Sequence, residues 1–387
     1  MAKEEKKAPK LRFNGYTNDW ERKKLGIYVP ITMGQSPNSK NYTNNPRDNI
    51  LVQGNADLYN NRVLKRTFTT EVTKIADRND ILISVRAPVG DIARNQYESI
   101  VIGRGIAAIK GNNFLYYQLE KMNNSGFWKK YIAGSTFESI TGKDLKSSDI
   151  YISNHKEEKS IGDIFQTLTK TIQLHEDHLQ FLHSFKSFLL QKMFFDNDIP
   201  PLLRFNKFTE KWNQCKLNDH TIVTMGQSPN SKNYTNNQTG KILVQGNADL
   251  YKNKILKRVF TTEVTKTAVK NDILISVRAP VGDIARNQYE SVVIGRGIAS
   301  IKGNDFLYYQ LEKMKNNGFW NKYIAGSTFE SITGKDLKNT KIYTTNSDEE
   351  RKIGNIFSSL TKIIQLQEHK IDSLKKLKQF LLQNMFI

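Results

Sequence analysis

The chain has 387 residues, of which 38% are hydrophobic, and a formal net charge of +20. This length predicts two or more domains with a sizeable core. The single cysteine, Cys215, excludes an intramolecular disulfide framework and a cysteine-cluster zinc site. No apolar run approaches the roughly 20 residues of a membrane span. The charged start MAKEEKKAPK lacks the apolar region of a secretory signal. We therefore expect a soluble cytoplasmic protein without a membrane partner.

The sequence contains one large internal repeat. Residues 11–195 align with 203–387 without a gap, and about 130 of the 185 aligned positions are identical. A repeat of this length is too long for a solenoid and indicates tandem duplication of a whole domain-plus-helix unit. The differences between the copies gather at 21–31, 46–49, 75–78 and 146–188. The runs that are nearly unchanged are 32–45, 79–99 and 131–146.

Each copy begins with a segment in which short apolar runs alternate with Gly, Pro and Asn, a pattern typical of β-strands and turns. One helix is expected near 112–130. The predicted fold class is α+β, with two β-rich domains and two long helices. The expected boundaries are a basic N-terminal tail at 1–10, a first domain at 11–153, a helix at 154–195, a linker at 196–202, a second domain at 203–345 and a second helix at 346–387.

The end of each copy has apolar residues at intervals of three and four over five heptads, which predicts a long amphipathic helix. Asn154 with Glu157 and Ser347 with Glu350 have the spacing of capping boxes, and Pro200 and Pro201 stop the first helix. We expect the two stripes to pack on each other as a coiled coil; the alternative is that each helix packs on its own domain. The predicted interface residues are Ile161, Leu168, Ile172, Leu182, Leu189, Ile353, Leu360, Ile364, Leu374 and Leu381.

The positive charge is concentrated in the two β-rich domains. They carry about +7 and +11, whereas the helices carry about 0 and +2. Excess charge of this size on two similar domains favours a nucleic-acid partner over a basic protein that is merely soluble.

Motifs of catalysis are missing. No P-loop and no H-E-x-x-H motif occurs. The run from Gly103 to Ala108 matches the dinucleotide pattern G-x-G-x-x-A, but it continues as a strand instead of a helix. We therefore expect a binding protein that has no catalytic residues, no metal site and no cofactor of its own.

Two polar loops are the first candidates for DNA contact. The amide, hydroxyl and lysine side chains from Met33 to Asn45, and again around Gln53, can read base edges in the major groove. An ordinary surface loop is the alternative, but the first loop is unchanged in the second copy. The candidates are Gln35, Ser36, Asn38, Ser39, Lys40, Tyr42, Gln53 and Asn55, with Gln227, Ser228, Asn230, Ser231, Lys232, Tyr234, Gln245 and Asn247 in the second copy.

Basic residues beside glycine and proline turns are the second candidates, because a guanidinium group and backbone amides can converge there on a phosphate. A structural turn with a solvated arginine is the alternative. The candidates are Arg86, Arg94 and Arg104, with Arg278, Arg286 and Arg296. A further cluster follows the aromatic run at Phe127: Lys129, Lys130, Ser135, Thr136 and Lys143, with Lys322, Ser327, Thr328 and Lys335.

At these residues the sequence strongly resembles the specificity (S) subunit of type I restriction–modification systems. The matching pieces are Leu11-Arg12-Phe13 with Trp20-Glu21, the run from Ser84 to Asp91, the run from Gly103 to Ala107, and the run from Gly134 to Asp144. A closing helix that ends Leu-Leu-Gln-x-Met-Phe also matches. Both halves carry these pieces, so the resemblance covers nearly the whole chain.

The resemblance implies two target recognition domains, each joined to a long helix, with the helices paired antiparallel in approximate two-fold symmetry. Each domain reads one half of a split double-stranded DNA site, and the helices set the gap. Two methyltransferase (M) subunits dock on the helices and bring S-adenosylmethionine for adenine N6 methylation. Restriction (R) subunits add ATP- and Mg²⁺-dependent translocation and cleavage.

One departure from the family pattern concerns the two domains, which usually differ in sequence but are nearly the same here. Two equal readers related by a two-fold axis read the same bases on opposite strands, which predicts a palindromic split site. The changed positions 46–49 and 75–78 could break this symmetry. Two other hypotheses remain at this point: a stand-alone DNA-binding regulator with duplicated domains, and a fused methyltransferase-nuclease, against which the missing motifs argue.

Overall fold

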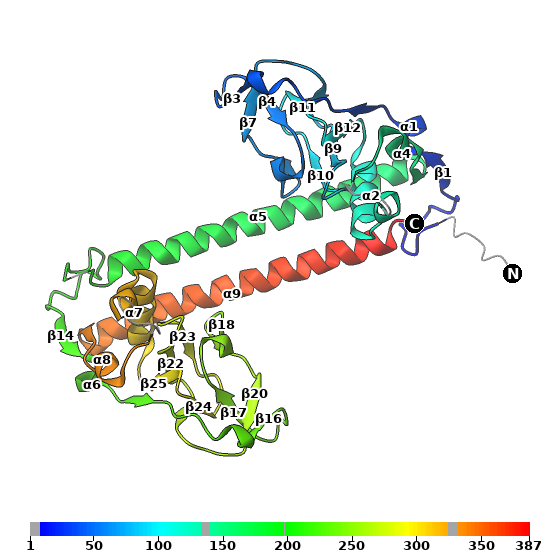
Figure 1. Cartoon of the computed structure of the whole chain (residues 1–387). Coiled ribbons are helices and arrows are strands. Elements are labelled where there is room, and N and C mark those ends of the chain that lie inside the picture. Colours follow the sequence, from blue (N-terminus) through cyan, green and yellow to red (C-terminus); the bar gives the residue numbers. More distant parts are fainter. Residues whose placement is uncertain (1–7, 133–138, 197, 324–330) are drawn as a thin grey trace. The chain divides into compact units, whose positions relative to one another are not determined.

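The computed structural model describes residues 8–132, 139–196, 198–323 and 331–387. It divides into two compact units (Figure 1). Unit 1 contains the chain up to Glu176 together with His369–Ile387, and unit 2 contains Asp177–Glu368. Each unit therefore holds one β-rich domain, the first half of the long helix that follows it, and the last half of the other long helix. The α+β class and the tandem duplication are confirmed.

The β-rich domain of unit 1 is built on two larger sheets and one two-stranded ribbon. The first sheet has the order β2-β12-β9-β10-β6-β5, the second has the order β3-β7-β4-β11-β8, and β1 pairs with β13. The strands are β1 (Glu21–Lys24), β2 (Ile31–Met33), β3 (Tyr42–Thr43), β4 (Asn49–Val52), β5 (Leu58–Tyr59), β6 (Arg62–Val63), β7 (Thr67–Thr69), β8 (Ile75–Asp77), β9 (Ile81–Ser84), β10 (Ile92–Arg94), β11 (Ser99–Ile102), β12 (Ile106–Ile109) and β13 (Asp149–Ile152).

Unit 2 repeats this arrangement with sheets β15-β25-β22-β23 and β16-β20-β17-β24-β21 and the pair β14-β26. The β18-β19 hairpin forms a separate two-stranded sheet, whereas its equivalent joins the larger sheet of unit 1 through one residue pair. The strands are β14 (Asn213–Lys216), β15 (Val223–Met225), β16 (Tyr234–Thr235), β17 (Lys241–Val244), β18 (Leu250–Tyr251), β19 (Lys254–Ile255), β20 (Val259–Thr261), β21 (Thr267–Val269), β22 (Ile273–Ser276), β23 (Ile284–Arg286), β24 (Ser291–Ile294), β25 (Ile298–Ile301) and β26 (Lys341–Thr344).

The two long helices expected from the periodicity are present as α5 and α9, and the helix expected near 112–130 is α2. The helices are α1 (Leu25–Tyr28), α2 (Asn113–Asn124), α3 (Lys129–Ile132), α4 (Gly142–Ser147), α5 (His155–Met193), α6 (Leu217–His220), α7 (Asp305–Asn316), α8 (Gly334–Lys338) and α9 (Ser347–Asn384). Among the described residues, no helix is long and apolar enough to cross a membrane.

The central strand β9 has all of its residues buried, because it is covered on both faces. Its side chains alternate between two cores, as the period of a strand requires. Ile81 and Ile83 pack with the aromatic residues of α2, and Leu82 packs toward the five-stranded sheet. This explains why the sequence shows a continuous apolar run here instead of an apolar–polar alternation.

In unit 1 the first half of α5 lies antiparallel to the last half of α9. Phe165, near the start of α5, packs with Phe386, which follows α9, at a centroid distance of 5.6 Å. Glu176, further along α5, pairs with Lys375, which is earlier in α9. Unit 2 has the equivalent contact between Phe357 and Phe194, also at 5.6 Å. Each β-rich core is therefore completed by residues from the end of the other copy's helix.

Both of the packing modes considered for the helices occur. Ile161 and Ile353 are buried in the cores of their own β-rich domains, whereas Leu182 packs with Leu360 and Ile364 between α5 and α9 within unit 2. Ile172 is also buried, and Leu168, Leu189, Leu374 and Leu381 are half-buried.

Other details of the periodic stripe differ from the prediction. The fully buried leucines at the helix ends are Leu190 and Leu382, one residue beyond those predicted. Phe185 and Leu377, which fit the interval of three and four, are exposed.

The predicted N-cap residue of α5 is correct, although the Glu157 carboxylate of the predicted capping box bonds Arg12 and Trp20 instead, and the predicted N-cap residue of α9 is one residue off. Asn154 accepts a hydrogen bond from the Glu157 amide at 3.0 Å. In the second copy the cap is Asn346, which accepts from the Glu349 amide at 2.9 Å, and not Ser347 with Glu350. Ser347 is instead the first residue of the helix.

Candidate nucleic-acid interface

Three loops meet at one end of the unit 1 sheets. The first follows β2, the second follows β4, and the third is the turn between β11 and β12. The Gln35 amide donates to the Ile102 carbonyl at 2.9 Å, and the Gly103 amide donates to the Val52 carbonyl at 2.8 Å. The Gly105 amide donates to the Gln53 carbonyl at 3.1 Å. The main chain thus holds together loops that are far apart in the sequence.

The glycines of this region are required because the loops approach each other closely. A Cβ atom at Gly34 would lie 2.1 Å from the Gly103 carbonyl oxygen, and one at Gly105 would lie 2.3 Å from the Gln53 carbonyl oxygen. No side chain fits at either position. The G-x-G pattern at Gly103 therefore serves loop packing, in agreement with its rejection as a dinucleotide motif.

These loops bring together five of the predicted residues, Gln35, Ser36, Tyr42, Gln53 and Arg104, which we call the loop cluster. The Ser36 hydroxyl accepts from the Arg104 amide at 3.1 Å, and the Tyr42 hydroxyl donates to Gln53 Oε1 at 3.3 Å. Gln35 and the Arg104 side chain are exposed, while Ser36, Tyr42 and Gln53 are half-buried. The cluster thus presents an amide and a guanidinium to solvent on a rigid base.

The loop cluster is repeated in unit 2. The Ser228 hydroxyl accepts from the Arg296 amide at 3.1 Å, and a Cβ atom at Gly297 would lie 2.3 Å from the Gln245 carbonyl oxygen. The equivalent residues are Gln227, Ser228, Tyr234, Gln245 and Arg296. The two β-rich domains therefore present the same side chains on the same loop framework.

Arg86 lies beside the loop cluster. The Val85 amide donates to the Gly105 carbonyl at 2.9 Å, and Arg86 is exposed directly after it. Arg278 has the equivalent place in unit 2, where the Val277 amide donates to Gly297 at 2.9 Å. The structure thus brings Arg86 and Arg104 to the same end of the sheet from two different turns.

Arg94 and Arg286 do not belong to this surface. The Arg94 guanidinium donates to the carbonyls of Asn79, Gly111 and Asn112 at 2.5–3.1 Å. It also lies 5.1 Å from the Tyr116 ring centroid, and burial lowers its pKa. The Arg286 guanidinium donates to the carbonyls of Asn271 and Gly303 and to the Asp305 carboxylate. Both arginines tie the β-rich domain to the start of α2 or α7, so the structure favours the structural alternative for them.

The remaining predicted residues have other places. Asn38 and Asn230 accept from the amides of Lys40 and Lys232 and so begin a 3₁₀ turn that carries Ser39 and Ser231. Asn55 and Asn247 are half-buried in short 3₁₀ turns after β4 and β17. The predicted lysines on α3, α4, α8 and the 3₁₀ turn equivalent to α3 are all exposed: Lys129, Lys130, Lys143, Lys322 and Lys335. Ser135, Thr136, Ser327 and Thr328 lie outside the described residues.

Several residues that form hydrogen bonds with the loops of the cluster were not predicted. The Glu71 carboxylate accepts from the Asn38 amide, the Thr73 hydroxyl donates to the Gln35 carbonyl at 2.5 Å, and the Arg66 guanidinium donates to the Ala56 carbonyl at 2.9 Å. Their segment, 64–74, differs from 256–266 at one position only. This near-identity between the copies was the signal that could have found them.

A buried network holds the start of each β-rich domain to its long helix. Arg12 donates to both oxygens of Glu157 at 2.7 and 2.8 Å, and the Trp20 indole donates to the same carboxylate at 3.2 Å. Glu349 has the same contacts with Arg204 and Trp212. Burial raises the pKa of Glu157, but the hydrogen bonds from Arg12 and Ser153 outweigh it and lower the pKa below its ordinary value. The pKa of Glu349 is lowered for the same reasons.

This lowered pKa predicts a loss of stability in acid. Both carboxylates stabilise the fold fully above their unfolded pKa, about 4.3, and this contribution is lost as the pH falls through the folded pKa below that value. A double variant, Glu157→Gln with Glu349→Gln, should be less stable at about pH 6 and lose less stability between about pH 6 and pH 3. Urea midpoints across this range measure the difference. Parallel pH curves for the variant and the wild type would contradict the assignment.

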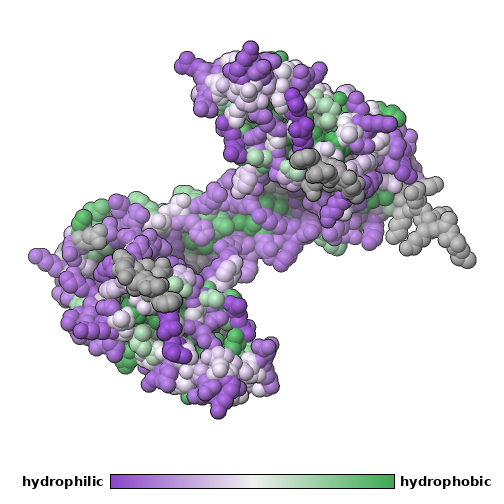
Figure 2. Space-filling view, in the orientation of Figure 1, coloured by the Kyte–Doolittle hydropathy of each residue, from purple (hydrophilic) through white to green (hydrophobic). Residues whose placement is uncertain are grey.

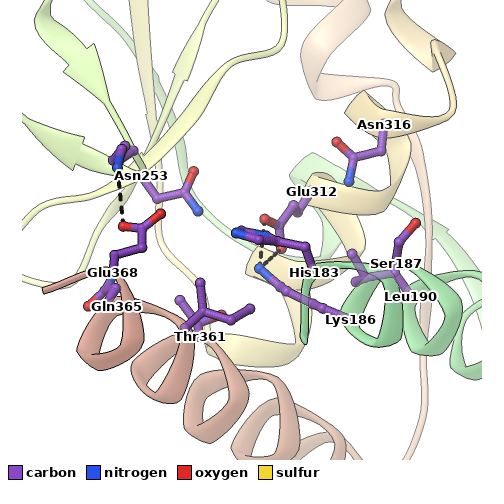
Figure 3. A pocket seen from close by; sticks show the side chains of 12 residues that line it. His183, Lys186, Ser187, Leu190, Asn253, Glu312, Asn316, Thr361, Gln365 and Glu368 are labelled. Carbon is purple, nitrogen blue, oxygen red and sulfur yellow. Dashed lines mark hydrogen bonds and ion pairs between the residues drawn. The ribbon is translucent and has the colours of Figure 1, made fainter. Parts of the chain in front are cut away.

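A second buried ion pair joins α5 to the β-rich domain of unit 2 (Figure 3). Lys186 on α5 lies 2.8 Å from the Glu312 carboxylate on α7, and both side chains are nearly buried. The pair lines a cavity of about 240 Å³ that Thr361 and Glu368 of α9 also line. Lys378 and Glu120 form the equivalent pair in unit 1 at 2.7 Å. In each unit, this pair connects the β-rich domain to the helix of the other copy.

The duplicated fold agrees with what the chain is similar to. The model of the type I restriction modification DNA specificity domain matches residues 17–183 and 209–376. The chain therefore belongs to this family and carries two such domains.

Two relatives come from Methanocaldococcus jannaschii. The putative type I restriction enzyme MjaX specificity subunit is 35% identical over 183 residues, which is 44% of this chain and 41% of that protein. The type I restriction enzyme MjaIX specificity subunit is 27% identical over 126 residues, 30% of this chain and 28% of that protein. The chain thus spans less than half the length of each of these relatives.

Two solved structures have the same fold. The crystal structure of a type I restriction-modification system S subunit from M. genitalium is 17% identical, with a TM-score of 0.68 over 98% of this chain and 99% of that one. A chain from a structure of complex assembly and conformational transition in the type I R-M system is 20% identical, with a TM-score of 0.58 over 95% and 97%. Because the sequence identities are this low, the two structures show that the fold is shared and nothing more.

Proposed function

We propose that this chain is the DNA sequence-recognition subunit of a type I restriction–modification complex. Each β-rich domain, the target recognition domain, reads one half of a bipartite site in double-stranded DNA. The observation that carries this proposal is the loop cluster, which occurs twice with the same residues and the same serine–arginine contact in a chain of the specificity-domain family.

The exposed side chains of the cluster have the chemistry of DNA contact. An amide such as that of Gln35 can donate to and accept from adenine in the major groove, and Arg104 can read guanine. Arg86 is exposed beside the cluster and can contact a phosphate, which would fix the domain on the duplex without reading sequence. The net positive charge of both domains supports this interpretation.

We also propose that the split DNA site is palindromic. Gln35, Tyr42, Gln53 and Arg104 have identical counterparts at Gln227, Tyr234, Gln245 and Arg296. Two readers with the same side chains, applied to the duplex in opposite orientations, read the same bases on opposite strands. The two halves of the site are then reverse complements of each other.

The catalytic subunits are proposed to dock on the long helices. Within unit 2, the exposed apolar residues Phe181, Phe185 and Phe188 follow one another at intervals of four and three, so they share one face of α5. Figure 2 shows green, apolar patches among the hydrophilic surface of each unit. Such a face fits an M subunit, which would bring S-adenosylmethionine, and R subunits would add ATP and Mg²⁺ chemistry. This chain itself is then non-catalytic.

Co-expression with the cognate M subunit tests the proposal. We expect the two chains to copurify, and we expect the complex to bind a split DNA site more tightly than the chain does alone. A stand-alone regulator, the competing function, would select the same DNA with equal affinity in the absence of the M subunit. Equal affinity for the split site with and without a bound M subunit would overturn the proposal.

A further inference from the structure

A carboxylate is hydrogen-bonded to the polar loop of each recognition domain. Glu71 follows β7, and its Oε2 accepts from the Asn38 amide at 2.8 Å and from Asn41 Nδ2 at 2.7 Å. Thr69 Oγ1 accepts from the Glu71 amide at 3.1 Å, which fixes the glutamate backbone. Glu263 makes the same bonds to Asn230 and Asn233, both at 2.7 Å.

These bonds hold the part of the loop that has no strand partner. Asn38 and Asn41 are the two ends of the 3₁₀ turn that carries Ser39 and Lys40. A single oxygen of Glu71 therefore fixes the turn at both ends. Thr73, two residues further on, holds the Gln35 carbonyl, so the segment 70–74 supports the whole loop from Gln35 to Asn41.

The charge of Glu71 opposes DNA binding in general, because it places an anion on a surface that would meet phosphates. The hydrogen bonds from Asn38 and Asn41 lower its pKa, so the carboxylate is ionised at neutral pH. A neutral side chain would repel DNA less. What the carboxylate provides is a pair of charge-assisted hydrogen bonds, which hold the loop more firmly than neutral bonds would.

We propose that Glu71 and Glu263 are specificity-determining positioning residues. They keep the base-reading loop of each domain in one conformation and at the same time weaken binding to random DNA. This inference rests on the proposed function, since it assigns these residues to the same DNA-reading loop. A loop held in one geometry discriminates better between bases than one that can adapt to several.

The test uses the complex with the M subunit and the variant Glu71→Gln with Glu263→Gln. Affinity for random duplex should rise, and the ratio of affinities for cognate and random duplex should fall by about tenfold, the loss expected for a hydrogen bond to a charged group. In the single variant Glu71→Gln, methylation should become less selective at one half-site only. If Glu71 and Glu263 only stabilised the fold, the double variant would have a lower melting temperature and would bind cognate and random duplex more weakly by the same factor.

The matched control is Glu98→Gln with Glu290→Gln, which removes the same charge from exposed side chains of the same domains. It should raise affinity for both DNAs equally and leave their ratio unchanged. Equal ratios for the two double variants, in a complex whose wild type methylates a split site, would overturn the positioning role alone. A wild-type complex that methylates no split site would instead overturn the proposed function.

Discussion

Alanine at both Gln35 and Gln227 is expected to relax the sequence selectivity of the complex while leaving its affinity for random DNA almost unchanged. Each glutamine presents an exposed amide from the loop cluster. A bidentate amide–base contact discriminates against the wrong base by about 1–3 kcal/mol, and the loss applies at each half-site. Competition binding with single-base variants of the methylated site measures the change.

The contrasting variant is Arg86→Ala with Arg278→Ala. A phosphate contact carries no sequence information, so cognate and random DNA should be bound more weakly by the same factor, and the slope of log affinity against log salt should decrease by about 2.

The control for the glutamine variant is Asn124→Ala, which removes an exposed amide outside the loop cluster. Equal losses on cognate and random DNA for the glutamine variant would remove its base-reading role.

Methionine at Lys186 is expected to lower the free energy of unfolding of unit 2 by about 3 kcal/mol. The substitution keeps the apolar stem of the side chain but leaves the Glu312 carboxylate without its cation, and that carboxylate is only 13% exposed. Adding Glu312→Leu removes the unpaired charge, so the double variant should recover most of the lost stability. Urea denaturation of the full chain provides the comparison.

A matched control lies in the same cavity. Lys252 and Glu368 are 3.2 Å apart, but the lysine side chain is 57% exposed. An exposed pair of this kind contributes about 0–1 kcal/mol, so Lys252→Met should have a small effect. If the two methionine variants destabilise the chain equally, the burial of the Lys186–Glu312 pair has no special role.

The sequence was most informative where one physical signal dominates. The period of the apolar residues predicted α5 and α9, and the identity of the two copies predicted that Gln35 and Arg104 share a function with Gln227 and Arg296. Period alone could not choose between the adjacent leucines at 189 and 190, because both fit an interval of three or four. The buried one is Leu190.

Other features depend on contacts between residues that are far apart in the chain. Arg94 and Arg104 both stand beside turn residues in the sequence, yet only Arg94 is enclosed by three carbonyl oxygens. Similarly, nothing local to Phe386 indicates that it packs with Phe114 and Phe165 in the core of the first domain. Glu71 was missed because an acidic residue does not fit the pattern of a DNA-binding surface.

We propose above that two equal recognition domains read a split site in DNA. The most direct test is to co-express the chain with its M subunit and to map N6-methyladenine on genomic DNA by single-molecule sequencing. We expect a split motif whose halves are reverse complements, methylated on both strands. A split motif with unrelated halves would contradict the equality of the two readers, and the absence of any split motif with the M subunit bound and active would contradict the claim itself.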